Sequence, residues 1–442
     1  MSNKPGTTCR YGRWLSAMSG SALLVGSQLA TLPASAASNE QIERQIEALK
    51  REFTRELDLL KQQLEKQKEA AANKTEEVEK IKQELSGVKE AAIKPPYDWT
   101  KSISFSLGGY TSAGYSTGSH SSRTFDSADF VPLITFTYKD IVMGQAELEN
   151  SITADGGTDV SLEQANLTFF PADHVAIVVG KFLSPLGQFQ QNYHPKWINK
   201  MVSRPVGFGE DATAAPLANL GLQVRGDVPV PGINRLTYAA FVANAPNLQI
   251  DAATGELDSI SNRPAVTSPN NKMVYGGRIS VFPIPSLEIG ASGAGGQTAI
   301  VANGATGKSR DYLAYGLDFT WIYSQDFNLR GEWIAQRVGS VGEETPGLVD
   351  ALAGVALTTS GGRWSAGYLQ AGYTFLPKWE AVLRVGRFDA PKKEFSQSQI
   401  AAGIDYWFAP SVVGKMTYEL NRGQSGTAAH GDRLLLQAVY GF

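Results

Sequence analysis

From residue 102 to residue 442, apolar and polar residues alternate with a period of two, and glycine, proline, asparagine and aspartate interrupt the alternation. A period of two is typical of β-strands that have one apolar and one polar face. The interruptions mark turns between strands. We predict sixteen strands, at 102–115, 131–139, 141–150, 160–170, 174–182, 217–228, 234–243, 273–282, 286–295, 311–323, 327–338, 363–375, 378–388, 397–408, 411–421 and 431–442.

The predicted connections alternate strictly between short turns and long loops. Short turns such as Lys139-Asp140 and Ala409-Pro410 are each followed, one strand later, by a longer segment. A transmembrane β-barrel has this asymmetry, with tight turns on the periplasmic side and an even number of strands. The predicted long loops are 116–130, 151–159, 183–216, 244–272, 296–310, 339–362, 389–396 and 422–430.

The last strand ends the chain on an aromatic carboxyl terminus, Phe442, after alternating apolar residues such as Leu436 and Tyr440. An edge strand of a soluble sandwich can look similar, so the prediction depends on repetition of the pattern. The pattern does repeat: Trp333 alternates with Glu332 and Arg330. We therefore predict an all-β transmembrane barrel of sixteen antiparallel strands, with an aqueous lumen rather than a packed core. The aromatic residues near strand ends predict an interfacial girdle: Tyr138, Phe169, Phe170, Tyr323, Phe375, Trp379, Trp407, Phe408 and Phe442.

Residues 38–94 contain no proline and only one glycine, Gly87, and they are rich in Glu, Lys, Gln and Ala. Apolar residues recur there at spacings of three and four, which predicts an α-helical coiled coil in the periplasm. The alternative is a single solvated amphipathic helix. Pro95-Pro96 ends the helix, and 95–101 is a linker to the barrel at 102–442.

Residues 1–37 resemble a secretory signal peptide, with three basic residues, an apolar stretch and the small-residue run Ala34-Ser35-Ala36-Ala37. The alternative is a membrane anchor. Cleavage would remove the single cysteine, Cys9, so the exported protein would have no disulfide framework and no thiolate site. We expect a protein of the cell outer membrane, with the coiled coil in the periplasm.

The formal net charge is −3, and loss of the three basic residues in 1–37 lowers it to −6. This balance gives no basic field for nucleic acid. The four histidines lack metal-ligand spacing, and we expect no metal and no cofactor. Glu147 and Glu149 share one strand face and suit fixed lumenal charge better than general acid and base catalysis, so we expect no enzyme activity.

The loop at 183–216 is the longest connection and the natural candidate for a pore constriction. Cationic side chains in a narrow passage favour anions. The alternative is that these side chains lie on a solvated loop surface or at a subunit contact. The candidate constriction residues are Lys196, Lys200 and Arg204, with His194 nearby, against Glu210 and Asp211.

Charged residues also recur on the strand face predicted to line the lumen. Acidic and basic residues are mixed, which is as consistent with a transverse electric field as with anion selectivity. The predicted lumen-facing residues are Arg225, Arg278, Arg330, Arg384, Lys415 and Arg433, with Glu147, Glu149, Asp227, Asp318, Glu332, Glu380 and Glu419.

Four segments resemble the phosphate-selective porin O and P family: 178–187, 219–226, 236–244 and 403–410. The most specific is Gly180-Lys181-Phe182 followed by Pro185-Leu186-Gly187. The resemblance implies a homotrimer of sixteen-stranded barrels, each with its third external loop folded inward. The amino-terminal coiled coil is similar to that of some sugar porins.

The function expected from these features is that of a porin, which gives small hydrophilic solutes and ions a passive route, with a possible preference for phosphate-like anions. The expected partners are outer-membrane lipid and lipopolysaccharide, two further copies of the chain and small ionic solutes, with a peptidoglycan contact through the coiled coil. The alternative is a structural tether between outer membrane and peptidoglycan, with the barrel as its anchor.

Overall fold

A computed structural model describes two separate parts of the chain: helical residues between 46 and 82, and the residues from 102 to 442. The chain divides into two compact units, 1–97 and 98–442. The predicted signal peptide and linker lie outside the described residues. The described positions are 46–47, 50–51, 53–55, 57–66, 68, 79, 82 and 102–442 apart from 120, 210–213, 215, 262 and 353–354.

All described residues between 46 and 82 are α-helical, as the pattern of that region predicts. Phe53, Leu57, Leu60 and Leu64 have exposed side chains within the single chain. A coiled coil would bury such residues against further helices. Self-association through this helix remains a prediction. No helix in the described part of the chain has the length and hydropathy needed to cross a membrane.

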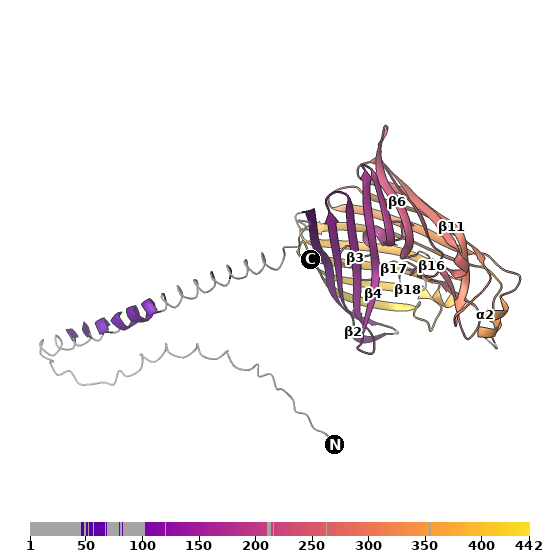
Figure 1. The fold of residues 1–442 in the computed structure, drawn as a ribbon. Coiled ribbons are helices and arrows are strands. Elements are labelled where there is room, and N and C mark those ends of the chain that lie inside the picture. Colours follow the sequence, from indigo (N-terminus) through magenta and orange to yellow (C-terminus); the bar gives the residue numbers. More distant parts are fainter. Residues whose placement is uncertain are drawn as a thin grey trace, which may run out of the picture. The chain divides into compact units, whose positions relative to one another are not determined.

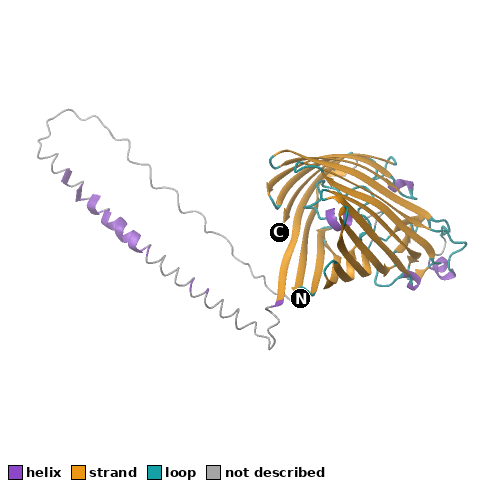
Figure 2. Cartoon of the chain, turned by 90° about the horizontal axis from the view of Figure 1, so that it is seen from above, coloured by secondary structure: helices purple, strands orange, loops and turns teal. Residues whose placement is uncertain are grey.

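The second unit is a closed antiparallel barrel of sixteen strands (Figures 1 and 2). Each strand pairs with its neighbour in sequence, and β1 pairs with β19 from Tyr110↔Gly441 to Gly118↔Arg433, which closes the sheet. Among the described strands of the barrel, closure leaves no edge with a row of unpaired backbone groups. The barrel strands are β1 (Ile103–Gly118), β2 (Ser121–Tyr138), β3 (Val142–Ile152), β4 (Thr158–Ala172), β5 (Val175–Leu183), β6 (Ala218–Val230), β7 (Ile233–Asn244), β10 (Met273–Ile284), β11 (Leu287–Ala302), β13 (Arg310–Ile322), β14 (Phe327–Val338), β15 (Gly362–Leu376), β16 (Trp379–Asp389), β17 (Gln397–Ala409), β18 (Val412–Gly423) and β19 (Gly431–Gly441).

Each predicted strand is present, which confirms the fold class, but the predicted loop 116–130 is wrong. β2 begins at Ser121, ten positions before the prediction, and pairs with β1 up to Gly118↔Ser121. The segment Ser121–Ala128 is polar apart from Phe125 and Ala128, so it shows no alternation, and its pairing with β1 decides its structure. The long loops also contain short elements that were not predicted. These are η2 (Phe189–Tyr193), β8 (Asn247–Ile250), β9 (Leu257–Ile260), η3 (Pro269–Asn271), β12 (Ala305–Thr306), α2 (Pro346–Ala351) and η4 (Lys393–Phe395).

The outer face of the barrel carries exposed apolar side chains on strand after strand. Trp333 is 38% exposed and Leu317 is 61% exposed, although both lie in the middle of a strand. Water does not favour such a continuous apolar surface, whereas lipid does. The belt includes Leu107, Phe136, Leu167, Val179, Leu222, Ile279, Ile289, Leu317, Trp333, Leu369, Leu383, Ile404, Met416 and Leu436.

The seven short turns lie at one end of the barrel, and the long loops lie at the other. We call these the short-turn end and the long-loop end. Lys139, His174 and Lys378 have positive φ in three of the short turns. Both β1 and the carboxyl terminus belong to the short-turn end, where Phe442 and Gly109 exchange backbone hydrogen bonds of 3.0 Å.

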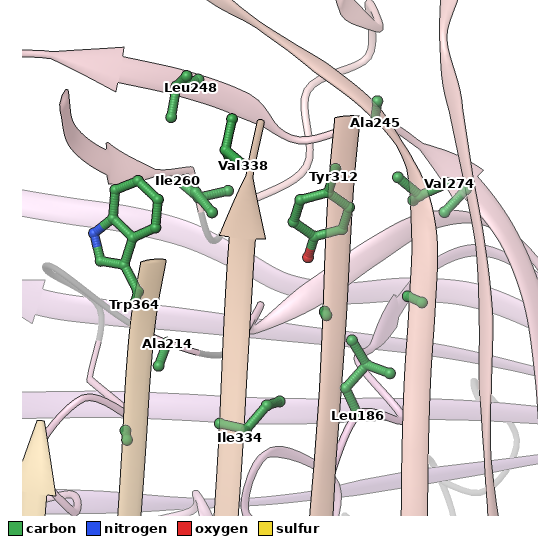
Figure 3. Packing of buried hydrophobic residues seen from close by; sticks show 14 of the residues in the cluster. Leu186, Ala214, Ala245, Leu248, Ile260, Val274, Tyr312, Ile334, Val338 and Trp364 are labelled. Atoms are coloured by element: carbon green, nitrogen blue, oxygen red, sulfur yellow. The ribbon is translucent and has the colours of Figure 1, made fainter. Parts of the chain in front are cut away.

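Part of the lumen contains a packed apolar cluster, which differs from the predicted aqueous interior. Inward-facing residues such as Ile334, Trp364 and Tyr312 are buried against loop residues such as Leu186 and Leu248 (Figure 3). The long loops fold into the barrel and cover this part of the wall, so apolar residues are buried on the inner face as well. Sequence alternation cannot reveal this packing, because it depends on loops distant in the chain.

Candidate functional site

The segment 184–217, between β5 and β6, crosses the inside of the barrel and contacts strands far from its own ends. The backbone N–H groups of Gln188 and Phe189 donate to the Glu332 carboxylate on β14, at 3.1 and 2.9 Å. The N–H of Val202 donates to the hydroxyl of Thr417 on β18, at 3.2 Å. We call this segment the crossing loop. Its position agrees with the inward-folding loop that the sequence predicts.

Two lysines of the crossing loop form ion pairs with carboxylates of the wall. Lys196 Nζ lies 2.5 Å from Asp129 Oδ2 on β2, and Lys200 Nζ lies 2.8 Å from Glu380 Oε2 on β16. Both carboxylates are at least nine-tenths buried. Lys200 also lies over the ring of Trp407, 4.8 Å from its centroid. These lysines therefore attach the loop to two parts of the wall, and their charges are balanced there.

Basic residues of the wall in turn hold the backbone of the crossing loop. Arg384 donates to the Ser203 carbonyl at 2.9 Å and to the Arg204 carbonyl at 3.2 Å. Lys415 donates to the carbonyls of Lys196 and Asn199. Since Arg384 and Lys415 are almost completely buried, they act as donors to the loop rather than as charges open to a solute.

The apolar side of the crossing loop packs on the wall through aromatic rings. Phe189 and Phe208 are fully buried, and their ring centroids lie 5.8 Å apart in an edge-to-face arrangement. Tyr368 on β15 contacts both, with a centroid distance of 5.3 Å to Phe208. This packing contributes to holding the loop against β14, β15 and β16.

Of the five predicted constriction residues, the structure describes three, Lys196, Lys200 and Arg204, and all three lie in the crossing loop. Glu210 and Asp211 lie outside the described residues, so their predicted role is untested. Arg204 follows the two paired lysines in the same loop and lines a cavity of about 510 Å³ together with Arg433. A preference for anions through these loop residues remains a prediction.

The predicted wall residues lie on the strands, but their surroundings differ greatly. Arg278 contacts Asp318 at 2.5 Å and Glu288 at 2.9 Å, and Arg433 contacts Glu419 at 2.7 Å. The other predicted residues are Arg330, whose guanidinium lies 4.1 Å from the Tyr193 ring centroid, Arg225, which lines a cavity, and the buried acids Glu147, Glu149 and Glu332.

The larger inner cavity, of about 850 Å³, lies at the short-turn end. Turn residues Lys139 and His174 line its mouth, and Gln191 of the crossing loop lines it from within the barrel. Arg225 on β6 and Arg235 on β7 contribute to its wall. The cavity is polar enough and large enough to admit hydrated ions.

Sequence reasoning missed several residues that shape the site. Asp129 fell within the predicted loop 116–130, so it was not recognised as a wall carboxylate. Trp407 was expected in the outer aromatic girdle, but it is partly buried inside, beneath Lys200. The alternation Asp405, Trp407 along β17 places both on one face, and this signal could have identified it.

A pair of charged side chains joins two long loops at the rim. Lys392 Nζ lies 2.7 Å from Asp251 Oδ2, and the backbone N–H groups of Ala253 and Thr254 also donate to Asp251. The Lys392 hydrogen bond, followed by these backbone bonds, lowers the pKa of Asp251 to about 2. The same contact raises the pKa of Lys392. Both groups are therefore ionised at neutral pH.

In the described part of the chain no cluster of three or more His, Cys, Asp or Glu residues has the arrangement of a metal site.

No protein-family profile matches the chain, and no curated protein matches its sequence. Among solved structures, the chain is similar to an anion-selective porin from Comamonas acidovorans, at 14% identity over 77% of this chain and 100% of that one, with a TM-score of 0.47. It is also similar to a loop L8 deletion mutant of OmpT, an outer membrane protein of Vibrio cholerae, at 11% identity, 77% and 100% coverage and a TM-score of 0.47. A Salmonella typhi OmpF complex with daunomycin aligns at 12% identity, over 78% of this chain and 99% of that one, with a TM-score of 0.47. Membership in the phosphate-selective porin O and P family remains a prediction.

Proposed function

We propose that this protein is a passive channel of an outer membrane, through which small hydrophilic solutes and ions diffuse. The observation that carries the proposal is the closed sixteen-stranded barrel, with an apolar outer belt and a charged inner wall crossed by one loop. The apolar outer belt suits contact with lipid, and the charged inner wall suits the passage of a polar solute.

The lengths of the strands support a membrane location. Even the shortest barrel strand, β5, has 9 residues, and β2 has 18. A tilted strand of about 9–11 residues spans the hydrocarbon core of a bilayer. In this proposal the short-turn end faces the periplasm and the long-loop end faces the exterior, where it meets lipopolysaccharide. The stalk at 38–94 then lies in the periplasm, holds three copies together and touches peptidoglycan.

The charge pattern supports passage of small polar solutes more than a single strong selectivity. Lys196, Lys200 and Arg278 are each balanced by carboxylates at 2.5–2.9 Å. Paired groups of this kind give a local transverse field without a large net charge. The class of solute that passes therefore depends on the charged side chains that have no opposite charge beside them.

Single-channel recording in planar bilayers tests the proposal. We expect discrete ohmic conductance steps from purified full-length protein, with a linear dependence on salt concentration. A folded, inserted barrel that gives no steps would contradict a channel function. Folding would be established independently by the heat-dependent shift in electrophoretic mobility that closed barrels show.

The second candidate function is a membrane anchor for a periplasmic tether. The observation that favours it is the apolar cluster around Trp364 and Ile334, which fills part of the lumen. An anchor would link membrane and peptidoglycan without conducting ions. Absence of conductance, together with loss of envelope attachment when 38–94 is deleted, would favour this function over the channel.

A further inference from the structure

Within the described part of the chain, Arg225 makes no hydrogen bond, ion pair or ring contact, whereas Arg330 and Arg235, which also have no ion pair there, lie over the rings of Tyr193 and Phe282. Among the residues that the structure describes, none forms a hydrogen bond or an ion pair with its guanidinium. By contrast, Arg278, on the same cavity, contacts two carboxylates at 2.5 and 2.9 Å. A partly enclosed guanidinium without a counter-charge favours a bound anion.

The position of Arg225 leaves room for such a ligand. Its neighbours across the sheet are Ala176 on β5 and Ala239 on β7, both of which have small side chains. All three residues line the 850 Å³ cavity at the short-turn end. The guanidinium is therefore flanked by space rather than by wall side chains.

Three acidic residues also line the cavity: Asp140 and Asp173 in the short turns, and Asp227 on β6. Asp227, two residues along β6, lies 3.8 Å from the ring of His174. Arg235 on β7 also lines the cavity, with its guanidinium 4.3 Å from the ring centroid of Phe282. Asp140 and Asp173 belong to the short turns at the cavity mouth, whereas Arg225 and Arg235 lie on β6 and β7 and have no ion pair with a described residue, unlike the lysines of the crossing loop.

We propose that Arg225 is the principal contact of a binding site for small oxyanions, inorganic phosphate or carboxylate solutes, reached from the short-turn end. A guanidinium presents parallel N–H donors that match two oxygens of such an anion. The inference rests on the proposed channel function for its physiological meaning, and it places anion preference at β6 rather than at Lys196 and Lys200.

The test compares wild-type protein with Arg225→Gln, and with Arg387→Gln as the matched control. Arg387 has a side chain that is 71% exposed and paired with Asp389, so its replacement removes the same charge outside the cavity. Inorganic phosphate is titrated into chloride-conducting single channels. We expect phosphate to reduce chloride current in the wild type, and Arg225→Gln to weaken this inhibition about tenfold, as loss of one charge-assisted contact predicts. Arg387→Gln should behave as wild type, and Arg225→Lys should retain part of the effect.

Calorimetric titration of phosphate into the detergent-solubilised full-length protein tests the site without any need for conductance. Weaker binding by Arg225→Gln alone supports the site, even if no channel opens. Equal inhibition and equal binding in wild type, Arg225→Gln and Arg387→Gln would overturn it, as would a wild type that does not bind phosphate. If every variant also conducts ions normally, that combined result supports the channel function and contradicts the Arg225 site.

Discussion

The Glu332 carboxylate occupies the space that a side chain at Gly187 would need. A Cβ atom added at position 187 would lie 1.7 Å from Glu332 Oε1, and Gly187 has a φ of +80°. The same carboxylate accepts the N–H groups of Gln188 and Phe189. The turn that begins the crossing loop therefore depends on glycine for both its conformation and its fit against β14.

We expect Gly187→Ala to displace the start of the crossing loop without unfolding the barrel. The left-handed conformation costs alanine about 1 kcal/mol, and the clash with Glu332 adds to this. Limited proteolysis should show faster cleavage within 184–217, and single channels should show altered conductance. Gly342→Ala is the control, since a Cβ there meets nothing within 4 Å. Equal cleavage of both variants would contradict the proposed fit.

Removing the amine of Lys200 should destabilise the protein more than removing that of Lys308. Lys200→Met leaves the buried Glu380 carboxylate without its 2.8 Å partner. We expect a loss of about 1–3 kcal/mol, because Lys200 is itself 28% exposed and water can partly replace it. Lys308→Met breaks an exposed pair with Glu343 and should cost at most about 1 kcal/mol.

Unfolding in detergent micelles measures this difference, with Glu380→Gln completing a double-mutant cycle. If Lys200 acts through Glu380, the double variant Lys200→Met with Glu380→Gln should be more stable than Lys200→Met. Strictly additive losses would show that the two side chains do not depend on each other.

The contact between Asp251 and Lys392 should make the rim loops sensitive to pH at both extremes. Because the pKa of Asp251 is lowered to about 2, its contribution is present above its ordinary pKa and is lost as the pH falls toward 2. Because the pKa of Lys392 is raised, its contribution is present below its ordinary pKa and is lost only at a still higher pH. Proteolysis of 245–272 should therefore be constant across neutral pH. Asp251→Asn should accelerate it at neutral pH, and an unchanged rate would refute the role of the pair.

The apolar side chains on the helix should control self-association and not barrel folding. Leu57→Lys with Leu60→Lys places charges on exposed apolar positions that further helices would cover. We expect cross-linking of the full-length protein to yield fewer oligomers, while heat-dependent electrophoretic mobility stays that of a folded barrel. Replacement of the exposed polar residue Glu65 by lysine is the control. Unchanged oligomers in the double variant would show that the barrel alone determines assembly.

The barrel was predictable because each strand carries its own signal: Trp333 and Glu332 point to opposite faces wherever the strand is placed. Ser121–Ala128 carries no such signal, because pairing with β1, rather than a difference between its faces, makes it a strand. The partners of Lys196 and Lys200 were not predictable either. They depend on where a long loop meets β2 and β16, and local sequence does not encode that meeting. The inward-folding loop itself was expected from its length and from the family resemblance.

The pairing of β1 with β19 has a consequence for the order of assembly. Tyr110 meets Gly441, so the contact that seals the cylinder joins residues more than 300 positions apart. A contact of such sequence separation carries the largest loop-closure cost of the structure, and it forms late. Until the carboxyl-terminal strand is synthesised and delivered, both terminal strands expose unpaired backbone groups. The unfinished chain therefore requires protection from aggregation on its way to the bilayer.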